Sequence, residues 1–218
     1  ASVAGAIYSS GSTALNVTNS TFQENQTTGS SNSGGAIMSS ADVATLDANT
    51  FTRNHSKGNG GAVSGEVIVT HSDFISNTAD ASGGAMCGGG TFSDTTFSGN
   101  SAGARGGAVY AYSVLTVTNS GFITNSASGG GALFVSNSTA TVIGSNLRNN
   151  TASNGGAIGI RDAAVLTLTD STLSGNSGAN GGALNTASSG TGKSPQLTAS
   201  ACTFTDNTAS NQGGVIYH

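Results

Sequence analysis

The chain has 218 residues, of which 117 are Gly, Ser, Thr or Asn; only 7% are charged, and the formal net charge is −4. Such a composition is typical of disordered chains, but a hydrophobic content of 35% argues against a solvated coil. A single Pro excludes a collagen-like chain, no apolar run approaches the ~18 residues of a membrane span, and six scattered basic residues argue against a nucleic-acid partner.

The small residues are periodic. A Gly-Gly-Ala-aliphatic motif recurs along the chain, with altered copies at Gly5 and Gly213. Self-similarity of this kind is the sequence signature of a repeat fold. The complete copies are Gly34–Ile37, Gly60–Val63, Gly83–Met86, Gly106–Val109, Gly130–Leu133, Gly155–Ile158 and Gly181–Leu184.

A second motif alternates strictly with the first: Phe or Leu, followed three residues later by Asn. We call its first residues the anchors; they follow one another at intervals of 29, 23, 23, 25, 25, 26 and 31 residues. This regularity indicates that each repeat is one structural unit. The anchors are Phe22, Phe51, Phe74, Phe97, Phe122, Leu147, Leu173 and Phe204.

Between the motifs, apolar residues alternate with Thr, as in residues 115–118 and 166–169, which is the period of a strand and not of an amphipathic helix. A repeat of roughly 25 residues suits three short strands with three turns, stacked ~4.8 Å from the next repeat. The sequence therefore predicts an all-β fold, a right-handed parallel β-helix solenoid of about eight three-strand coils. We expect one domain over residues 1–218, with a longer irregular loop at 186–196.

Alignment on the anchors sorts the other residues into columns. The column five positions before the anchor is apolar and is expected to face inward with the anchors: Val17, Leu46, Val69, Phe92, Val117, Val142, Leu168 and Ala199. Three positions after the anchor, every coil has Asn. Stacked Asn side chains can hydrogen-bond along the solenoid axis, so we expect an internal, structural amide ladder. This Asn column comprises Asn25, Asn54, Asn77, Asn100, Asn125, Asn150, Asn176 and Asn207. The Gly pairs are expected at bends or at close approaches between coils.

The alternation of Gly-Gly-Ala-Ile with Phe-x-x-Asn resembles the paired repeat signatures of the polymorphic outer membrane proteins of chlamydiae, and the likeness extends from Gly5 to Ile216. Related repeats occur in many secreted β-helix proteins. The resemblance implies a passenger region of a surface adhesin without enzymatic activity. It implies an extracellular or cell-surface location and contact with a host or environmental surface.

The columns six and four positions before the anchor are rich in Thr and are predicted to face outward. Such Thr-x-Thr faces are similar to those of β-helical ice-binding proteins, so ice binding is an alternative function. Thr is also simply favoured on exposed strands, and Asp47, Ile68 and Ile143 interrupt the array. The candidate binding residues are Thr45, Thr91, Thr116, Thr118, Thr141, Thr167, Thr169 and Thr198.

Six Asn-x-Ser/Thr sequons are candidates for covalent glycans if the source glycosylates its secreted proteins. Asn25 and Asn54 belong to the Asn column and are expected to be buried, which makes them poor acceptors. The better candidates lie at outward or turn positions: Asn16, Asn19, Asn137 and Asn149.

No catalytic residue, metal site or cofactor is predicted. Many parallel β-helices cleave acidic polysaccharides with carboxylates clustered on adjacent coils. Asp94 and Asp170 share a column but are three coils apart, and Glu24 and Asp206 lie in one column at opposite ends. The nearest approach to a cluster is His71 with Asp73, Asp94 and Glu66. A polysaccharide lyase or hydrolase is therefore the least favoured function. Cys87 and Cys202 are four or five coils apart, too far for a disulfide, and are expected to act as small apolar fillers.

Both ends of the sequence show the same phase of the repeat, at 4–8 and 213–217, and no capping segment is recognisable. We therefore expect either a segment of a longer solenoid or a protomer that stacks on itself end to end into fibres. The predicted function is a non-enzymatic structural or adhesive β-helix. Tyr8, Tyr110 and Phe134, which follow the Gly-Gly-Ala motif, are expected to be exposed aromatic contacts.

Overall fold

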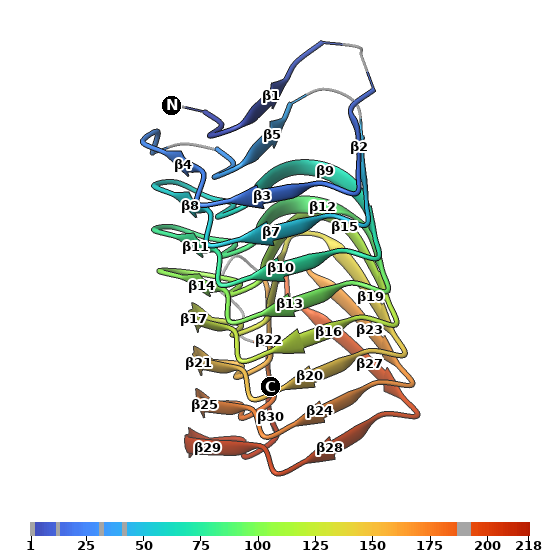
Figure 1. Cartoon of the computed structure of the whole chain (residues 1–218). Helices are drawn as coiled ribbons and strands as arrows, with labels where there is room; N and C mark the ends of the chain where they lie inside the picture. The colour runs from blue at the N-terminus through green and yellow to red at the C-terminus, as the bar shows by residue number, and fades with distance from the viewer. Residues whose placement is uncertain (1–2, 12–13, 31–32, 41–42, 187–192) are drawn as a thin grey trace.

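The computed structural model describes residues 3–11, 14–30, 33–40, 43–186 and 193–218, and every regular element in these ranges is a β-strand. The strands form three parallel sheets that run the length of the molecule (Figure 1). The predicted all-β parallel solenoid is confirmed, with about seven turns. Nothing in the described ranges is a helix long and apolar enough to cross a bilayer. Within the expected loop at 186–196, residues 187–192 are not among the residues that the structure describes.

The three sheets differ in their number of strands. Within the described ranges, sheet 1 has 14 strands, and sheets 2 and 3 have eight each. Sheet 1 contains β1 (Ile7–Ser9), β2 (Asn16–Thr18), β5 (Ile37–Ser39), β6 (Ala44–Asp47), β9 (Val63–Thr70), β12 (Met86–Ser93), β15 (Val109–Thr118), β18 (Leu133–Ser136), β19 (Thr139–Ile143), β22 (Ile158–Arg161), β23 (Val165–Thr169), β26 (Leu184–Asn185), β27 (Gln196–Ser200) and β30 (Ile216–Tyr217). Sheet 2 contains β3 (Thr21–Gln23), β7 (Thr50–Thr52), β10 (Asp73–Ile75), β13 (Thr96–Ser98), β16 (Gly121–Ile123), β20 (Asn146–Arg148), β24 (Thr172–Ser174) and β28 (Thr203–Thr205). Sheet 3 contains β4 (Gln26–Thr27), β8 (His55–Ser56), β11 (Thr78–Ala79), β14 (Ser101–Ala102), β17 (Ser126–Gly129), β21 (Thr151–Asn154), β25 (Ser177–Asn180) and β29 (Thr208–Gln212).

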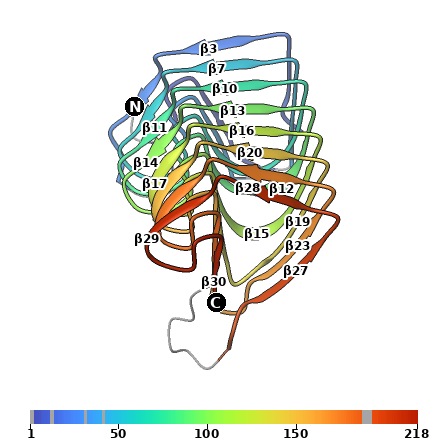
Figure 2. The ribbon, with the colours of Figure 1, turned by 90° about the horizontal axis from the view of Figure 1, so that it is seen from below.

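Each coil runs through sheet 1, sheet 2 and sheet 3 and returns to sheet 1 at the Gly-Gly turn. Some coils cross sheet 1 in one long strand, such as β15, and others in two, such as β18 and β19, which both pair with β15. Seen from the C-terminal end, the chain runs counter-clockwise as it approaches the viewer (Figure 2). The solenoid is therefore right-handed, as predicted.

The two corners that flank the anchor each place a residue in the left-handed region. In the coil of Phe122, these residues are Asn119 before the anchor (φ 48°) and Thr124 after it (φ 54°). Asn, Asp and Gly tolerate this conformation best, which explains why turn residues accumulate in both columns. Asp94 and Asp170, which share the first of these columns, each have φ 50° and are corner residues.

The two glycines of the third turn have different tasks. Gly130 has φ +59°, a conformation that side chains rarely adopt. Gly131 needs no such freedom, but a Cβ atom on it would lie 2.1 Å from the carbonyl oxygen of Gly156 in the next coil. The first glycine therefore makes the bend, and the second permits close contact between coils.

The aligned columns are confirmed by the strand register. The anchors oppose one another from Phe22 to Phe204. The apolar column is likewise in register from Val17 to Ala199. Both columns are buried through the middle coils, whereas Phe22 and Phe204 are half-buried and Ala199 is exposed.

The aromatic anchors form a continuous stack. The ring centroids of Phe22, Phe51, Phe74, Phe97 and Phe122 follow one another at 4.9, 4.7, 4.9 and 4.8 Å, with interplanar angles of 7–13°. This spacing is that of the parallel strands that carry the rings. The repeat length and the register thus place identical side chains directly on one another.

Candidate functional site

The Asn column lies inside the solenoid, behind the corner between sheets 2 and 3. Asn100 is typical: its backbone N–H and its Nδ2 both donate to Asn125 Oδ1, at 2.9 and 3.0 Å, and Nδ2 also donates to the Phe74 carbonyl oxygen at 2.9 Å. The same bonds recur between Asn25 and Asn207. Each inner amide thus connects three coils through hydrogen bonds made within the solenoid.

A second polar column, which the sequence reasoning missed, lies two positions before the anchor. Ser145 is an example: its Oγ donates to the Ile143 carbonyl oxygen at 2.9 Å and accepts the Ser120 backbone N–H at 3.1 Å. These side chains are mostly buried and join successive corners between sheets 1 and 2. The signal was present as a run of short polar residues: Ser20, Asn49, Ser72, Thr95, Ser120, Ser145 and Ser171.

The Thr columns lie in register on sheet 1. Five consecutive coils place Thr residues opposite one another: Thr91, Thr116, Thr141, Thr167 and Thr198. In the second column, Thr118 and Thr169 lie on either side of Ile143. Earlier in the chain, Thr45 and Thr91 lie on either side of Ile68. Ile68 and Ile143 are 41% and 37% exposed, so apolar side chains divide the array.

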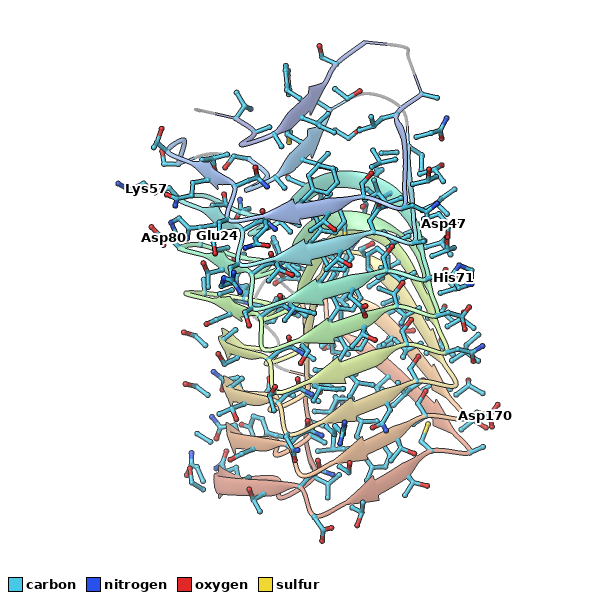
Figure 3. All side chains as sticks on the ribbon, viewed as in Figure 1. Glu24, Asp47, Lys57, His71, Asp80 and Asp170 are labelled. Atoms are coloured by element: carbon cyan, nitrogen blue, oxygen red, sulfur yellow. The ribbon has the colours of Figure 1, made fainter. Side chains whose placement is uncertain are left out.

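Asp47 interrupts the second Thr column and makes an ion pair at the corner. It accepts hydrogen bonds from Thr70 Oγ1 at 2.5 Å and from His71 Nδ1 at 3.0 Å. The Thr70 bond foremost, and then the His71 bond, lower the pKa of the Asp47 carboxyl. The bond to Asp47 raises the pKa of His71 above its usual 6.5. Figure 3 shows the two side chains together, with Asp170 farther along the same side.

We expect the native protein to show a His71 pKa above 6.5 and the Asp47→Asn variant to bring it back toward that value. Because the folded-state pKa of His71 is raised, the contribution of its titration to stability is complete below the unfolded-state pKa of His71 and is lost as pH rises through the folded-state pKa. Protonation of Asp47, whose folded-state pKa is lowered, removes the ion pair in acid. NMR titration of the His71 ring protons measures this shift. Asp73→Asn is the matched control, and an equal pKa in the wild type and Asp47→Asn would contradict the assignment.

The expected cluster of His71 with Asp73, Asp94 and Glu66 is not assembled as a unit. His71 bonds to Asp47 instead, and Asp94 acts on it only as a weaker, more distant charge. Asp73 lies beyond the corner on β10, and Glu66 lies in the first half of β9, where it accepts a hydrogen bond from Ser113 Oγ. The cluster does not form because its members lie on different faces of the coil.

The other carboxylates are also dispersed. Glu24, in the column of Asp206, pairs with Arg53 of the next coil at 2.6 Å, and both side chains are exposed. Glu24 and Asp80 lie on the side of the solenoid opposite Asp47 (Figure 3). Within the described ranges no group of three or more His, Cys, Asp or Glu side chains is placed to hold a metal ion.

Five of the six sequon residues have the exposure that their columns predict. Asn16 and Asn19 are exposed, as are Asn137 and Asn149. Asn54 is fully buried. The expectation that Asn25 is buried was wrong: it is half-buried because it lies in the first coil of its column, although its Nδ2 donates to Asn54 Oδ1 at 2.9 Å.

The two cysteines are free, and their environments differ. Cys87 is buried in β12, and this burial raises the pKa of its thiol to about 12. Cys202 is half-buried at the position that Ser holds in other coils, and its Sγ donates to the Ser200 carbonyl oxygen at 3.2 Å. Cys87 therefore matches the expected apolar filler, whereas Cys202 stands in for a corner serine.

We expect a thiol reagent at pH 8 to label Cys202 of the native chain and to reach Cys87 only after denaturation, since the thiolate is the reactive form. A reagent that releases a chromophore on reaction with a thiol counts the accessible thiols by absorbance. Without guanidinium it counts those of the native chain, and with guanidinium it counts both. Cys202→Ser restores the residue usual in that column and should leave almost no labelling in the native state. Rapid native labelling of Cys202→Ser would show that Cys87 is accessible.

The aromatic residues after the Gly-Gly-Ala motif are not equally exposed. Tyr8 is 55% exposed and Tyr110 is half-buried. Phe134 is only 7% exposed, so the expectation of an exposed contact was wrong for this residue. Its ring lies against Gly159, where a Cβ atom would be 2.7 Å from Phe134 Cδ2, and the Arg105 guanidinium covers it at 5.2 Å from the ring centroid.

Beside Phe134, a pocket lies where sheet 3 turns into sheet 1, at the passage from β17 and β21 to β18 and β22. This corner pocket has a volume of about 460 Å³. Its lining combines small residues and amides with two arginines: Gly103, Ala104, Arg105, Ser128, Gly129, Phe134, Asn154, Ile160, Arg161 and Asn185. The sequence reasoning missed the pocket because its residues belong to several columns.

Three segments of the chain match the family model of the Chlamydia polymorphic membrane protein repeat: residues 50–66, 94–112 and 201–218. Each segment contains one anchor and the Gly-Gly turn that follows it. At these three positions the chain is similar to the polymorphic membrane protein repeat. In the structure, each matched segment runs from sheet 2 through sheet 3 and the Gly-Gly turn into sheet 1. Neither the curated proteins nor the solved structures show a significant match to the chain.

Proposed function

We propose that this chain is a non-enzymatic structural or adhesive β-solenoid displayed at the cell surface. The three matches to the polymorphic membrane protein repeat carry the proposal, because they lie in register along one continuous solenoid. A regular repeat of this kind gives a long, rigid surface on which the same face recurs in every coil.

The composition of the interior supports a function that depends on the outer surface. The Phe stack, the aliphatic column and the hydrogen-bonded Asn column occupy the inside of the coils. Their groups are apolar, or are neutral amides that bond to one another, so they offer nothing to a substrate. Contact with another molecule therefore falls to the outer faces of the sheets and to the corners.

Two measurements test this proposal. Antibodies against the chain should label intact cells of the source, and beads coated with the purified chain should adhere to host or environmental surfaces more than beads coated with albumin. Labelling that requires permeabilised cells, together with no adhesion, would overturn it. Incubation with pectin-like polymers should release no products; products abolished by Asp94→Ala would show that the chain is an enzyme.

Assembly and glycans are finer parts of the same proposal. Polar outer faces and exposed sequons suit a glycosylated surface array that grows by end-to-end stacking. Electron microscopy of the native material at high concentration tests the fibre, and only monomers would refute it. Mass spectrometry of the peptides containing Asn16, Asn19, Asn137 and Asn149 tests the glycans, and unmodified peptides alone would refute them.

Ice binding is the second candidate, and the in-register run of Thr116, Thr141, Thr167 and Thr198 favours it. Parallel strands space these hydroxyl and methyl groups regularly, at about 4.8 Å. If this face binds ice, the purified chain shapes growing crystals, and Thr141→Tyr abolishes the shaping without unfolding the protein. Unshaped crystals in the presence of the wild-type chain would exclude this function.

A further inference from the structure

The corner pocket exists because two side chains are missing from its walls. Arg105, Gly129 and Asn154 are consecutive members of one column, so the absence of a side chain at Gly129 opens a gap of about two strand spacings between the arginine and the amide. Phe134 and Gly159 are consecutive members of another. The Phe134 ring lies across both glycines, 3.1 Å or less from where their Cβ atoms would be, and forms an apolar wall of the gap.

The pocket is positively charged, whereas the chain as a whole has a negative net charge. The chain has ten acidic residues and six basic ones, yet two of its four arginines line this pocket and no acidic residue of the described ranges does. Among the described residues, no carboxylate lies within ion-pair distance of Arg105, which lies on the Phe134 ring. Arg161 approaches Asp162 only at 3.9 Å, through Nε, and the Asp162 carboxylate also accepts a hydrogen bond from Ser136 Oγ at 3.1 Å. Two guanidinium groups with so few carboxylates near them favour the binding of an anionic ligand.

Polar groups beside the arginines suit hydroxyl groups on the same ligand. Asn154 Oδ1 accepts a hydrogen bond from Asn180 at 3.0 Å, which leaves its Nδ2 as a donor at the pocket. Ser128 Oγ donates to the Gly103 carbonyl oxygen at 2.9 Å and keeps its capacity to accept. The pocket therefore offers donors, an acceptor, an apolar ring and two cationic groups, within a volume that suits one or two sugar rings.

We propose that the corner pocket binds an acidic sugar residue of a surface glycan, with Arg105 and Arg161 on its anionic group and Phe134 against its ring. The proposal rests on the adhesive function proposed above and names its ligand class. A carboxylate and a sulfate would use the same guanidinium groups. An extended acidic peptide suits the site less well, because β17 and β18 are paired on both sides and offer no free strand edge.

Calorimetry with the full chain tests the proposal, using trigalacturonic acid, a sulfated galactose oligosaccharide, neutral galactotriose and an octa-aspartate peptide. We expect one or both acidic sugars to bind, more weakly as salt rises, and galactotriose not to bind. Arg105→Gln and Arg161→Gln should each weaken binding roughly ten-fold, since each removes a charge-assisted contact. Arg148→Gln, an exposed arginine on β20 outside the pocket, is the matched control and should leave binding unchanged.

Gly159→Ala is a second variant that retains both arginines. Its new methyl group would displace the Phe134 ring, so we expect weaker binding of the acidic sugar with the fold intact by circular dichroism. Equal binding of galactotriose, equal losses in Arg148→Gln, or no binding of either acidic sugar would overturn the proposal. Arginine-dependent binding of octa-aspartate at the same affinity would replace the sugar with a peptide. Bead adhesion that persists in the Arg105→Gln, Arg161→Gln double variant would reject the pocket and retain the adhesive function.

Discussion

Replacement of Asn125 by alanine is expected to lower the free energy of unfolding by about 3–5 kcal/mol, one of the largest effects of any single side chain in this protein. The change removes the Nδ2 donor to the Phe97 carbonyl oxygen and to Asn150 Oδ1, both at 3.0 Å. It also removes the acceptor for the backbone N–H and the Nδ2 of Asn100, at 2.9 and 3.0 Å. Asn125 is fully buried, so water cannot replace the lost partners.

Urea unfolding followed by circular dichroism measures the loss. Asn146→Ala is the matched control, because Asn146 lies one coil later, on β20, with an exposed side chain. Its effect should stay within about 0.5 kcal/mol. Asn125→Asp keeps the shape but replaces the donor with an acceptor, so it should also destabilise strongly at pH 7. If Asn125→Ala were as stable as Asn146→Ala, the buried amides would not contribute to the stability of the solenoid.

Replacement of Gly131 by alanine should destabilise the solenoid at least as severely, by about 4 kcal/mol or enough to prevent folding. The new Cβ atom would lie 2.1 Å from the Gly156 carbonyl oxygen and 2.7 Å from the backbone nitrogen of Thr151. Both obstacles are backbone atoms of the next coil, which cannot rotate away as a side chain can. Relief of the clash requires the two coils to separate, and this breaks hydrogen bonds such as Ala132 N to Ala157 O at 2.8 Å.

Gly121→Ala is the control for this second prediction. Gly121 lies on β16 without a left-handed φ, and the nearest atom to its added Cβ would be Ile123 Cδ1 at 3.9 Å. Alanine there should be neutral or slightly stabilising, because it reduces the entropy of the unfolded chain. Thermal unfolding of the two variants separates the explanations. Equal destabilisation in both would mean that glycine acts through strand propensity and not through close contact between coils.

Much of the fold was predictable because the solenoid turns sequence distance into spatial distance. One repeat is one coil, so the residue that occupies the same position in the next repeat is the residue directly above it. Alignment on the anchors therefore predicted that Phe51 opposes Phe74 and that Val117 opposes Val142, as the register shows. The same alignment predicted the strand period, the three-sheet coil and the exposure of five of the six sequon residues.

The alignment was less successful where residues of different columns meet. It suggested His71 with Asp73, but the corner turns these residues apart and brings Asp47 to His71. It missed the second polar column, two positions before the anchor, because a short polar residue there is indistinguishable in sequence from a residue of a solvated turn. Only the structure shows that Ser145 is buried and bonds to both its own coil and the preceding one.

By itself, the sequence determined the period, the columns and hence the stacked core, since each of these depends on one repeat being placed on the next. The tertiary structure alone decided what the surface presents. Phe134 follows the same motif as the half-buried Tyr110, yet it is buried, because the neighbouring positions Gly129 and Gly159 have no side chains to hold it out. The same two gaps open the pocket that Arg105 and Arg161 line from different columns. A column alignment follows one line of side chains along the axis, whereas a pocket forms between lines, where the coil bends.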